Sequence, residues 1–357
     1  MTRAIKQALI GLALAGCFDT PSTELPLIEF LEPLELFPGE LSGPEERVLE
    51  LPDGRVALLE RFVPSITILD WHTGSQLRAG RRGRGPGEFE QPHALLLIHS
   101  DTLALLEAVG RKIHFFTTAG EFVQSTLMPA GPSYAFSEVF SDTAGRIYVV
   151  GRGNLQRALE AGDDSLAVYR FQAGQLNVDS IWTAGMSPLR RMPIDGGAAI
   201  MPLVFSDRDA IGVSADGRVI RASARLQQFD QWQDGVVTPL GAPWGLTPAR
   251  VTQRDRDSVT RERSAIRVYR GIKLSFADRK AVFDRLVVAP SGEAWLRLTE
   301  PQAGKQVYRV FAADGKPRFD LAPPAGSVLA GIGAEYIYFL RESEEGEVLI
   351  RARLPER

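Results

Sequence analysis

Short segments rich in hydrophobic residues, some continuous and some alternating with polar positions, recur along most of this chain, and tight-turn signals separate them. Ser65–Asp70, Ala94–Ile98, Leu103–Glu107 and Lys112–Thr117 are examples, each rich in apolar, β-branched or aromatic residues. Segments this short with such a composition predict β-strands rather than helices. The same pattern recurs from residue 25 to the end of the chain. The sequence therefore predicts an all-β protein built from repeated units.

Two kinds of tight turn mark each repeat. The first turn contains Gly54, Gly145, Gly217 or Gly292, with Ser100-Asp101 and Ala334-Glu335 in the equivalent place. The second turn contains Gly74, Gly120, Gly174, Gly235 or Gly315. Glycine after a small or acidic residue favours hairpins, because glycine tolerates the positive φ of the turn. Six first turns and five second turns predict six four-stranded blades, of which the last lacks its outer strand.

The missing strand has a candidate at the other end of the sequence. Leu27–Phe37 has strand-like apolar and aromatic content, and Pro33 within it suits an edge strand. We predict that this segment pairs with the last blade. Such pairing closes a six-bladed β-propeller and removes the exposed strand edges of an open sheet.

The repeats are unevenly spaced, which locates insertions. A four-stranded blade needs about 40–50 residues, and the intervals between first turns from 145 to 217 and from 217 to 292 are longer. The extra residues lie in Gly151–Asp164 and Thr183–Asp209, and in Thr247–Asp284 between blades four and five. Within the last insertion, Thr252–Asp255 and Ser275–Asp278 resemble capping boxes with Asp in place of Glu or Gln. We predict that each opens a short helix.

One connection carries a more specific signature. Gly83-x-Gly85-x-Gly87-x-Phe89-x-x-Pro92 is followed by strands ending at Gly120. This motif resembles the NHL-repeat (TolB-like) type of six-bladed β-propeller, especially its bacterial lipoprotein members. Glu60 and Glu107 stand near the place where such repeats commonly carry an aspartate. Propellers of this type include binding platforms as well as lyases and metal-dependent lactonases, so the resemblance leaves the function open.

The N-terminal sequence predicts where in the cell the protein is located. Arg3 and Lys6 precede the apolar segment Ala8–Ala13, and Leu14–Cys17 resembles a bacterial lipobox. We predict a signal peptide over residues 1–16, lipid attachment at Cys17, a tether over 17–24 and the propeller over 25–357. The protein would then be a membrane-anchored lipoprotein of the bacterial cell envelope. An ordinary secretory signal with a chance cysteine is the alternative. Cys17 is the only cysteine, so an internal disulfide is excluded.

Charge and histidine content narrow the possible chemistry. The formal net charge of −3 argues against a nucleic acid partner. His99-Ser100-Asp101 has the residue types of a hydrolase triad, but chain neighbours cannot point at one another as a triad requires. The four histidines show no metal-binding spacing. We therefore predict no catalytic residue, no metal and no cofactor.

Binding remains the leading interpretation. Strands alternate in direction, so the insertions and the glycine-rich connection Gly80–Pro92, all in strand-two-to-three loops or blade-to-blade connections, share one face. The predicted ligand-binding residues on them are Arg81, Arg82, Arg84, Arg152, Arg190 and Arg191; Arg78, Arg250 and Arg254 lie on or next to the same segments. Arginine favours carboxylates and other anionic groups, and the helical insertion would form a partial lid.

We predict a monomeric, lipid-anchored module that binds an anionic small ligand, a glycan or a protein partner. The arginines could also belong to a mixed solvated surface. A metal-dependent propeller hydrolase or lyase (lactonase-like), with its site at the channel mouth, is the alternative function. A structural subunit of an envelope complex is a third.

Overall fold

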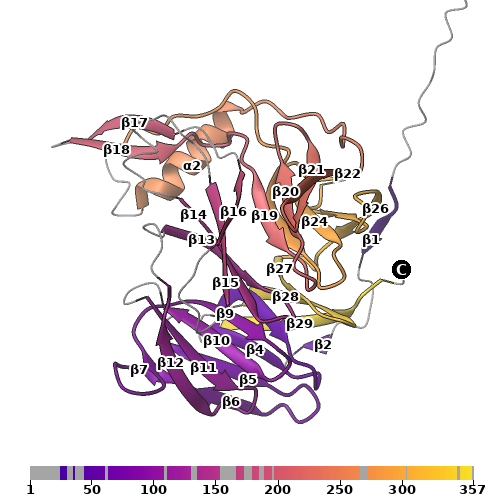
Figure 1. Cartoon of the computed structure of the whole chain (residues 1–357). Helices are drawn as coiled ribbons and strands as arrows, with labels where there is room; N and C mark the ends of the chain where they lie inside the picture. The colour runs from indigo at the N-terminus through magenta and orange to yellow at the C-terminus, as the bar shows by residue number, and fades with distance from the viewer. Residues whose placement is uncertain are drawn as a thin grey trace, which may run out of the picture.

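The chain folds as a six-bladed β-propeller (Figure 1). The computed structural model describes residues 25–29, 35–36, 44–60, 63–107, 111–129, 135–152, 166–172, 179–184, 189–194, 197–265, 272–302, 304–343 and 346–355. Six antiparallel sheets follow one another in chain order around a common centre, as the turn pattern predicts.

Each blade pairs its strands in sequence order. Blade one contains β3 (Pro44–Glu50), β4 (Val56–Glu60), β5 (Ser65–Leu69) and β6 (Gln76–Ala79). Blade two contains β9 (Pro92–Ile98), β10 (Thr102–Glu107), β11 (Lys112–Thr117) and β12 (Phe122–Leu127). Blade three contains β13 (Ala135–Ser141), β14 (Arg146–Arg152), β15 (Leu166–Gln172) and β16 (Asp179–Ala184). Blade four contains β19 (Ala210–Val213), β20 (Val219–Ser223), β21 (Gln228–Gln233) and β22 (Val236–Leu240). Blade five contains β23 (Phe283–Val288), β24 (Ala294–Leu298), β25 (Tyr308–Phe311) and β26 (Pro317–Ala322). Blade six contains β27 (Ser327–Ile332), β28 (Tyr336–Ser343) and β29 (Gly346–Arg353).

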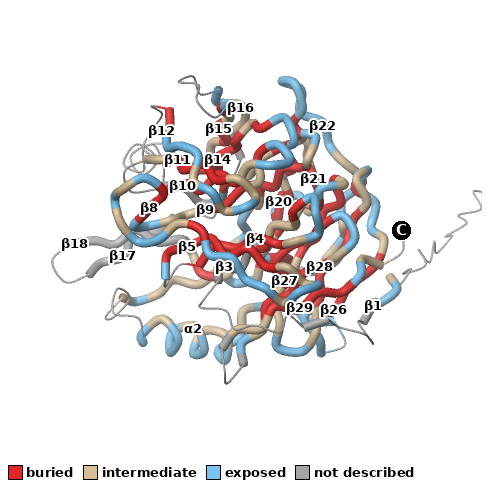
Figure 2. Tube along the Cα trace, turned by 90° about the horizontal axis from the view of Figure 1, so that it is seen from below, coloured by how far each residue is buried: buried red, intermediate tan, exposed pale blue. Residues whose placement is uncertain are grey.

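The core lies between the blades. Strand β4 is buried at all five positions, because its sheet packs against a neighbouring blade on each face. Val56 and Leu58 of blade one, for example, share a cluster with Tyr338 and Leu349 of blade six. Buried positions accordingly run through the middle strands in Figure 2. Two-sided burial explains why many segments read as continuous apolar runs rather than strict alternation.

The N-terminal segment closes the ring, though not as one strand. Strand β2 (Glu35–Leu36) pairs antiparallel with β29 and supplies the outer strand of blade six, as predicted. Strand β1 (Leu27–Glu29) instead pairs parallel with β26 of blade five. The prediction that all of Leu27–Phe37 joins the last blade is therefore wrong for its first residues. The segment is long enough to reach two adjacent sheet edges, and two edges are covered instead of one.

Polar and stacking contacts also join blade six to blade one. The Tyr338 hydroxyl donates to Glu50 Oε2 at 2.5 Å, and the backbone N–H of Ala334 donates to Glu50 Oε1 at 2.8 Å. The guanidinium of buried Arg351 lies 4.4 Å from the ring centroids of both Trp71 and Tyr336. These contacts, together with the apolar cluster, hold the first and last blades against each other.

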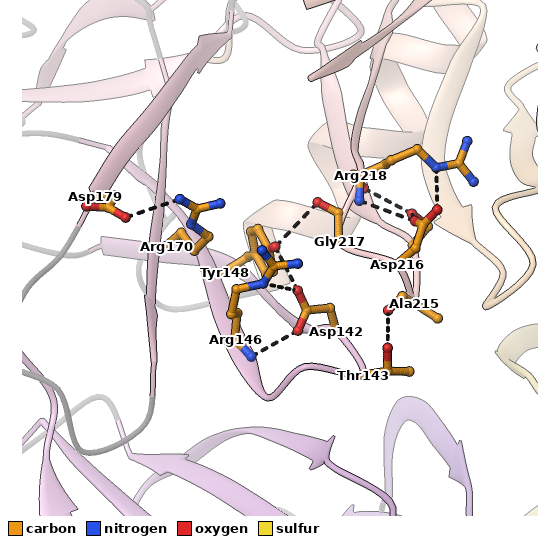
Figure 3. A network of polar contacts seen from close by, with 11 residues as sticks. Asp142, Thr143, Arg146, Tyr148, Arg170, Asp179, Ala215, Asp216, Gly217 and Arg218 are labelled. Atoms are coloured by element: carbon orange, nitrogen blue, oxygen red, sulfur yellow. Dashed lines mark hydrogen bonds and ion pairs between the residues drawn. The ribbon is translucent and has the colours of Figure 1, made fainter. Parts of the chain in front are cut away.

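The strand-one-to-two turns of adjacent blades are also joined by polar contacts (Figure 3). Buried Asp142 accepts hydrogen bonds from Arg146 Nε at 2.5 Å and from the Tyr148 hydroxyl at 2.9 Å. The Tyr148 oxygen also lies 3.3 Å from the carbonyl oxygen of Gly217 in the next blade. A Cβ on Gly217, whose φ is 85°, would lie 2.5 Å from the Arg146 guanidinium. The positive φ favours glycine here, and a Cβ would in addition have to displace the Arg146 guanidinium from its place beside Asp142.

The insertions differ in part from expectation. Helix α2 (Gln253–Ala265) begins at the Thr252–Asp255 capping box, as predicted. The Ser275–Asp278 box opens no helix; its backbone bonds to Val204 instead, through Val204 N to Ser275 O and Ala277 N to Val204 O, both 2.9 Å. The insertion before blade four forms a hairpin of β17 (Leu189–Ile194) and β18 (Gly197–Pro202). Residues 153–165 of the other insertion lie outside the described residues.

The remaining short elements are β7 (Arg81–Arg82) and β8 (Glu88–Phe89), which pair parallel in the connection between blades one and two. In the part of the chain that the structure describes, no helix is long and apolar enough to span a bilayer. Helix α2 is polar and buries none of its residues (Figure 2).

Candidate functional site

The first cluster of predicted ligand-binding arginines lies in the β7–β8 connection. Arg81 and Arg84 are 81% and 83% exposed, and each already has an acidic partner in the same loop. Arg81 pairs with Glu88 at 2.7 Å, and Arg84 pairs with Glu90 at 3.1 Å. Exposed pairs of this kind contribute little free energy and compete with any incoming anion.

The glycine-rich signature around these arginines has a packing role. Phe89 is fully buried and meets the ring of Phe116 edge-on. A Cβ at Gly80 would lie 2.4 Å from the Phe89 ring. The Glu88 carboxylate accepts the Gly85 N–H, and this bond together with Arg81 holds the pKa of Glu88 below its ordinary value. The motif therefore fixes the junction between the first two blades.

The other predicted site residues are placed by their backbones only. Arg152 ends β14, and Arg190 and Arg191 lie on β17. Their side chains lie outside the described residues, as does Cys17. The structure therefore brings the predicted arginines onto blade connections or strand ends, without showing contacts between the groups.

Two of the insertions meet. Val204 and Phe205, just before blade four, bond to the segment that leads into blade five, where the Ala281 N–H donates to the Phe205 carbonyl at 2.9 Å. Lys280 in that segment lies 5.9 Å from the Phe205 ring centroid. It also forms ion pairs with Asp255 of α2 at 3.0 Å and with Glu300 at 2.9 Å. These contacts attach the N-terminal end of α2 to blades four and five.

The capping box sets the start of α2. Asp255 accepts hydrogen bonds from the Thr252 hydroxyl and backbone N–H at 2.6 and 2.8 Å. These bonds, with the nearby Lys280 ammonium, lower the pKa of Asp255 to about 2. The first turn of the helix, which includes Arg256, is therefore held in place by these bonds.

A pocket of about 360 Å³ lies beside this first turn. Its lining residues are Arg250, Val251, Arg256, Asp278 and Arg279. Two chain segments approach each other there, because Arg250 and Arg279 form an antiparallel bridge and the Val251 N–H donates to the Asp278 carbonyl at 3.0 Å. The pocket is thus built between α2 and the strand-like segment that follows it.

Three guanidinium groups line this pocket. Arg256 stacks over the Phe276 ring at 5.3 Å, and Arg279 Nη1 donates to the Pro248 carbonyl at 3.2 Å. Among the described residues, none of Arg250, Arg256 and Arg279 has a carboxylate within ion-pair distance, whereas Arg81 and Arg84 do. Three neighbouring cations raise the local potential and favour a bound anion, and the single carboxylate in the lining, Asp278, offsets only part of their charge. This pocket is the candidate binding site.

Sequence reasoning found this site only in part. The sequence pattern draws attention to Arg250 and Arg254 in the insertion, but it does not distinguish Arg256 and Arg279 from the other arginines. The register between residues 250 and 279 depends on long-range pairing that no local pattern indicates. The arginine-rich composition of α2 was the available signal.

The first strands of the blades, which lie nearest the central axis, carry apolar residues rather than the arginines that line the pocket. First strands of neighbouring blades contact one another, including β27 with β3 and β19 with β23, so they lie nearest the axis. The partly buried apolar residues on first strands include Leu49, Leu97 and Phe140. Among the described residues, no group of three histidine, cysteine, aspartate or glutamate side chains could hold a metal ion.

Blade two contains a buried polar relay that sequence reasoning missed. His114 on β11 lies between Glu107 on β10 and Ser125 on β12, with Nδ1 2.9 Å from Ser125 Oγ and Nε2 3.4 Å from Glu107 Oε2. Glu107 also accepts the backbone N–H groups of Glu90 and Gln91 at 2.6 and 2.9 Å. The glutamate therefore anchors the connection from blade one. His99, by contrast, lies in an exposed turn.

Both buried groups of the relay have depressed pKa values. Burial lowers the pKa of His114 below 6.5, and this outweighs the opposing hydrogen bond with Glu107. Burial alone would raise the pKa of Glu107, but hydrogen bonds from Gln91, Glu90 and His114 hold it below 4.5. At neutral pH the relay thus contains a neutral imidazole and an ionised carboxylate.

These shifts predict an acid-sensitive stability. Below pH 6.5 His114 binds a proton in the unfolded chain but stays neutral in the folded protein. The free energy of unfolding therefore decreases as the pH falls. For one titrating group, the free energy of unfolding changes by at most about 1.4 kcal/mol per pH unit. Glu107 contributes in the same direction, but only at pH values lower still. Urea unfolding measured at pH 7.5 and at pH 5.5 should show that the free energy of unfolding falls more between these pH values for the wild type than for His114→Gln. An equal fall in both proteins would contradict the assignment.

Comparisons with known structures agree with the fold. A member of the DUF4221 family from Bacteroides vulgatus has a TM-score of 0.54 at 8% identity, covering 90% of this chain and 98% of that one. A protein described as exported, from Bacteroides fragilis, has a TM-score of 0.51 at 10% identity, covering 91% and 95%. A gluconolactonase from Xanthomonas campestris has a TM-score of 0.49 at 10% identity, covering 90% and 89%. At these identities the similarity concerns the propeller fold alone. No protein-family model and no curated protein matches the sequence.

Proposed function

We propose that this protein is a binding module of the bacterial cell envelope that captures an anionic ligand in the pocket beside α2. The observation that carries the proposal is the convergence of Arg250, Arg256 and Arg279 on one pocket. Among the described residues none of the three forms an ion pair, although Asp278 also lines the pocket. A planar guanidinium offers paired N–H donors to a carboxylate or phosphate. The volume of about 360 Å³ suits a small organic acid or the terminal acidic group of a glycan or peptide.

The predicted arginines outside the pocket lie on the face that carries the blade connections and insertions, and they form a second part of the proposed contact area. Arg82 is exposed on β7, and Arg81 and Arg84 are held by acidic neighbours. We include Arg81, Arg82, Arg84, Arg152, Arg190 and Arg191 as secondary contacts, of which Arg81 and Arg84 are weakened by their ion pairs with Glu88 and Glu90. Because exposed charges are screened by salt, their effect on affinity is smaller than that of the pocket arginines.

The binding test compares two sets of arginines. Isothermal titration calorimetry with citrate and with inorganic phosphate is performed on the wild type and on Arg256→Gln/Arg279→Gln. Each charged hydrogen bond lost costs roughly 1.5–3 kcal/mol, so the double variant should bind at least ten times more weakly. Arg82→Ala/Arg84→Ala should weaken binding less than about threefold, because these side chains are exposed to salt.

A matched control sits on the same helix. Arg261→Gln removes a charge nearer the C-terminal end of α2, outside the pocket lining, and should bind like the wild type. Equal affinity for all the variants, or a loss confined to the β7–β8 loop variant, would refute the pocket assignment. The same titrations with anionic glycans and acidic peptides would then rank ligand classes.

Membrane attachment is a separate part of the proposal. Cys17 follows a lipobox-like sequence and is the only cysteine, so metabolic labelling with a palmitate analogue should mark the wild type and not Cys17→Ser. Equal labelling of both, or of neither, would count against the anchor. One acyl chain binds a membrane only marginally, whereas several chains bind stably.

A further inference from the structure

We propose that Ser125, His114 and Glu107 form a hydrolytic site for esters of apolar acyl groups, separate from the anion pocket. The three side chains come from adjacent strands of blade two, and the serine lies at the solvent-exposed end of the series. This activity goes beyond the binding function, and neither depends on the other.

The hydrogen bonds have the polarity that a serine nucleophile needs. An ionised Glu107 accepts from His114 Nε2–H, so Nδ1 carries the lone pair and accepts from the Ser125 hydroxyl. The serine-to-imidazole distance of 2.9 Å is within general-base reach. The ring is turned relative to the familiar hydrolase arrangement, in which Nε2 faces the serine. The roles of the three groups are otherwise the same.

The depressed pKa values fit these roles. His114 is neutral at pH 7 and can take a proton, and Glu107 is ionised and can stabilise the imidazolium that forms. Two backbone N–H groups from the preceding connection fix the Glu107 carboxylate in place. This carboxylate in turn holds the orientation of the imidazole. Phe89 covers the imidazole on a further side at a centroid distance of 6.0 Å.

Blade one shows that the fold does not require a histidine here. Glu60 ends β4 as Glu107 ends β10, and it is likewise buried. The partner seven residues later is Thr67, whose hydroxyl donates to Glu60 Oε1 at 2.9 Å. A threonine hydroxyl is therefore a sufficient hydrogen-bond partner for the equivalent glutamate, and no imidazole has to be buried there. The buried glutamate of blade two does not need a histidine as its partner, and the presence of one with a shifted pKa favours a functional role.

The surroundings of Ser125 indicate the substrate class. Leu127, two residues further along β12, is 64% exposed and lies on the same face by strand alternation. Phe122 lies toward the other end of the strand and packs against the blade-one cluster. Lys112 lies on the same face two residues before His114, and its charge acts on the imidazole. Apolar neighbours suit an apolar acyl chain, and the ammonium can stabilise a developing oxyanion.

The reaction is a balanced hydrolysis with water as the second reactant. Ser125 Oγ bonds to the acyl carbon while its proton passes to His114 Nδ1. The carbon–oxygen bond to the alcohol breaks, and the alcohol leaves with the proton from Nδ1. Water then attacks the acyl-serine, its proton passing to Nδ1 and on to Ser125 Oγ as the acid is released.

The experiment uses an alkyl fluorophosphonate probe and p-nitrophenyl butyrate with the full chain. We expect one labelled peptide, containing Ser125, and measurable ester hydrolysis. Ser125→Ala should abolish the label, and His114→Gln should slow labelling roughly 10²-fold or more. Ser75→Ala, which alters an exposed serine in blade one, should react like the wild type.

Two further readings separate chemistry from folding. The labelling rate should fall in acid, at pH values below the ordinary imidazole pKa of about 6.5, because burial lowers the pKa of His114. Ser125→Ala should remain folded and melt cooperatively, with a small loss of stability because His114 Nδ1 loses its hydrogen bond. If His114→Gln fails to fold, Glu107→Gln provides the rate comparison. Labelling of Ser125 no faster than of Ser75, or a label on another residue, would overturn the proposal.

Discussion

Phe89→Ala is expected to destabilise the propeller by about 3–5 kcal/mol, which is the usual range for removing a fully buried aromatic side chain. Phe89 is fully buried, lies edge-on to Phe116 and covers His114. Its loss would leave a cavity between the first two blades and free the glycine-rich connection. For a chain of this size the melting temperature should fall by roughly 4–7 °C.

The control for this prediction stays in the same loop. Arg82→Ala changes an exposed side chain on β7 and should change stability by no more than about 0.5 kcal/mol. Chemical denaturation of both variants gives the comparison. A Phe89→Ala variant within 1 kcal/mol of the wild type would mean that the signature motif does not serve as a packing junction.

Removing residues 1–38 is expected to have an effect as large, because two sheet edges lose a strand at once. Strand β2 covers β29, and β1 covers β26, where the Asp320 N–H donates to the Pro26 carbonyl at 3.0 Å. Ile28 also packs against the cluster between blades five and six. The lost hydrogen bonds and apolar contacts should lower the free energy of unfolding by several kcal/mol.

Truncation to residue 25 is the matched comparison, since it keeps both strands. The two truncated proteins are unfolded by heat under the same conditions. Light scattering should also show that only the shorter protein self-associates, because bare strand edges pair with other chains. Equal melting temperatures would show that the N-terminal strands add nothing to closure.

The number of blades and their boundaries could be predicted because they depend on local chemistry. Gly54, Gly217 and Gly292 mark turns that need positive φ, and the structure gives them φ values of 83°, 85° and 87°. The start of α2 was likewise readable, since Thr252 and Asp255 lie three residues apart and complete each other's hydrogen bonds.

What could not be predicted depends on contacts between distant residues. Ser275–Asp278 has the local form of a helix start, yet Val204, about 70 residues earlier, holds it extended through backbone bonds. Arg250 meets Arg279 only after the chain passes through α2. The alignment of Glu107, His114 and Ser125 follows from the register of three strands, which the turn lengths fix but the residue types do not reveal.

The most direct test of the account is a crystal structure of the protein soaked with selenate, read from the anomalous signal of selenium. Selenate has the charge and shape of a small oxyanion, and it needs several N–H donors to replace its water. The account predicts an anomalous peak in the pocket, bridging Arg256 and Arg279 with Arg250 alongside, and no such peak in Arg256→Gln/Arg279→Gln. Selenate bound only elsewhere, or a pocket peak that persists in the double variant, would contradict it.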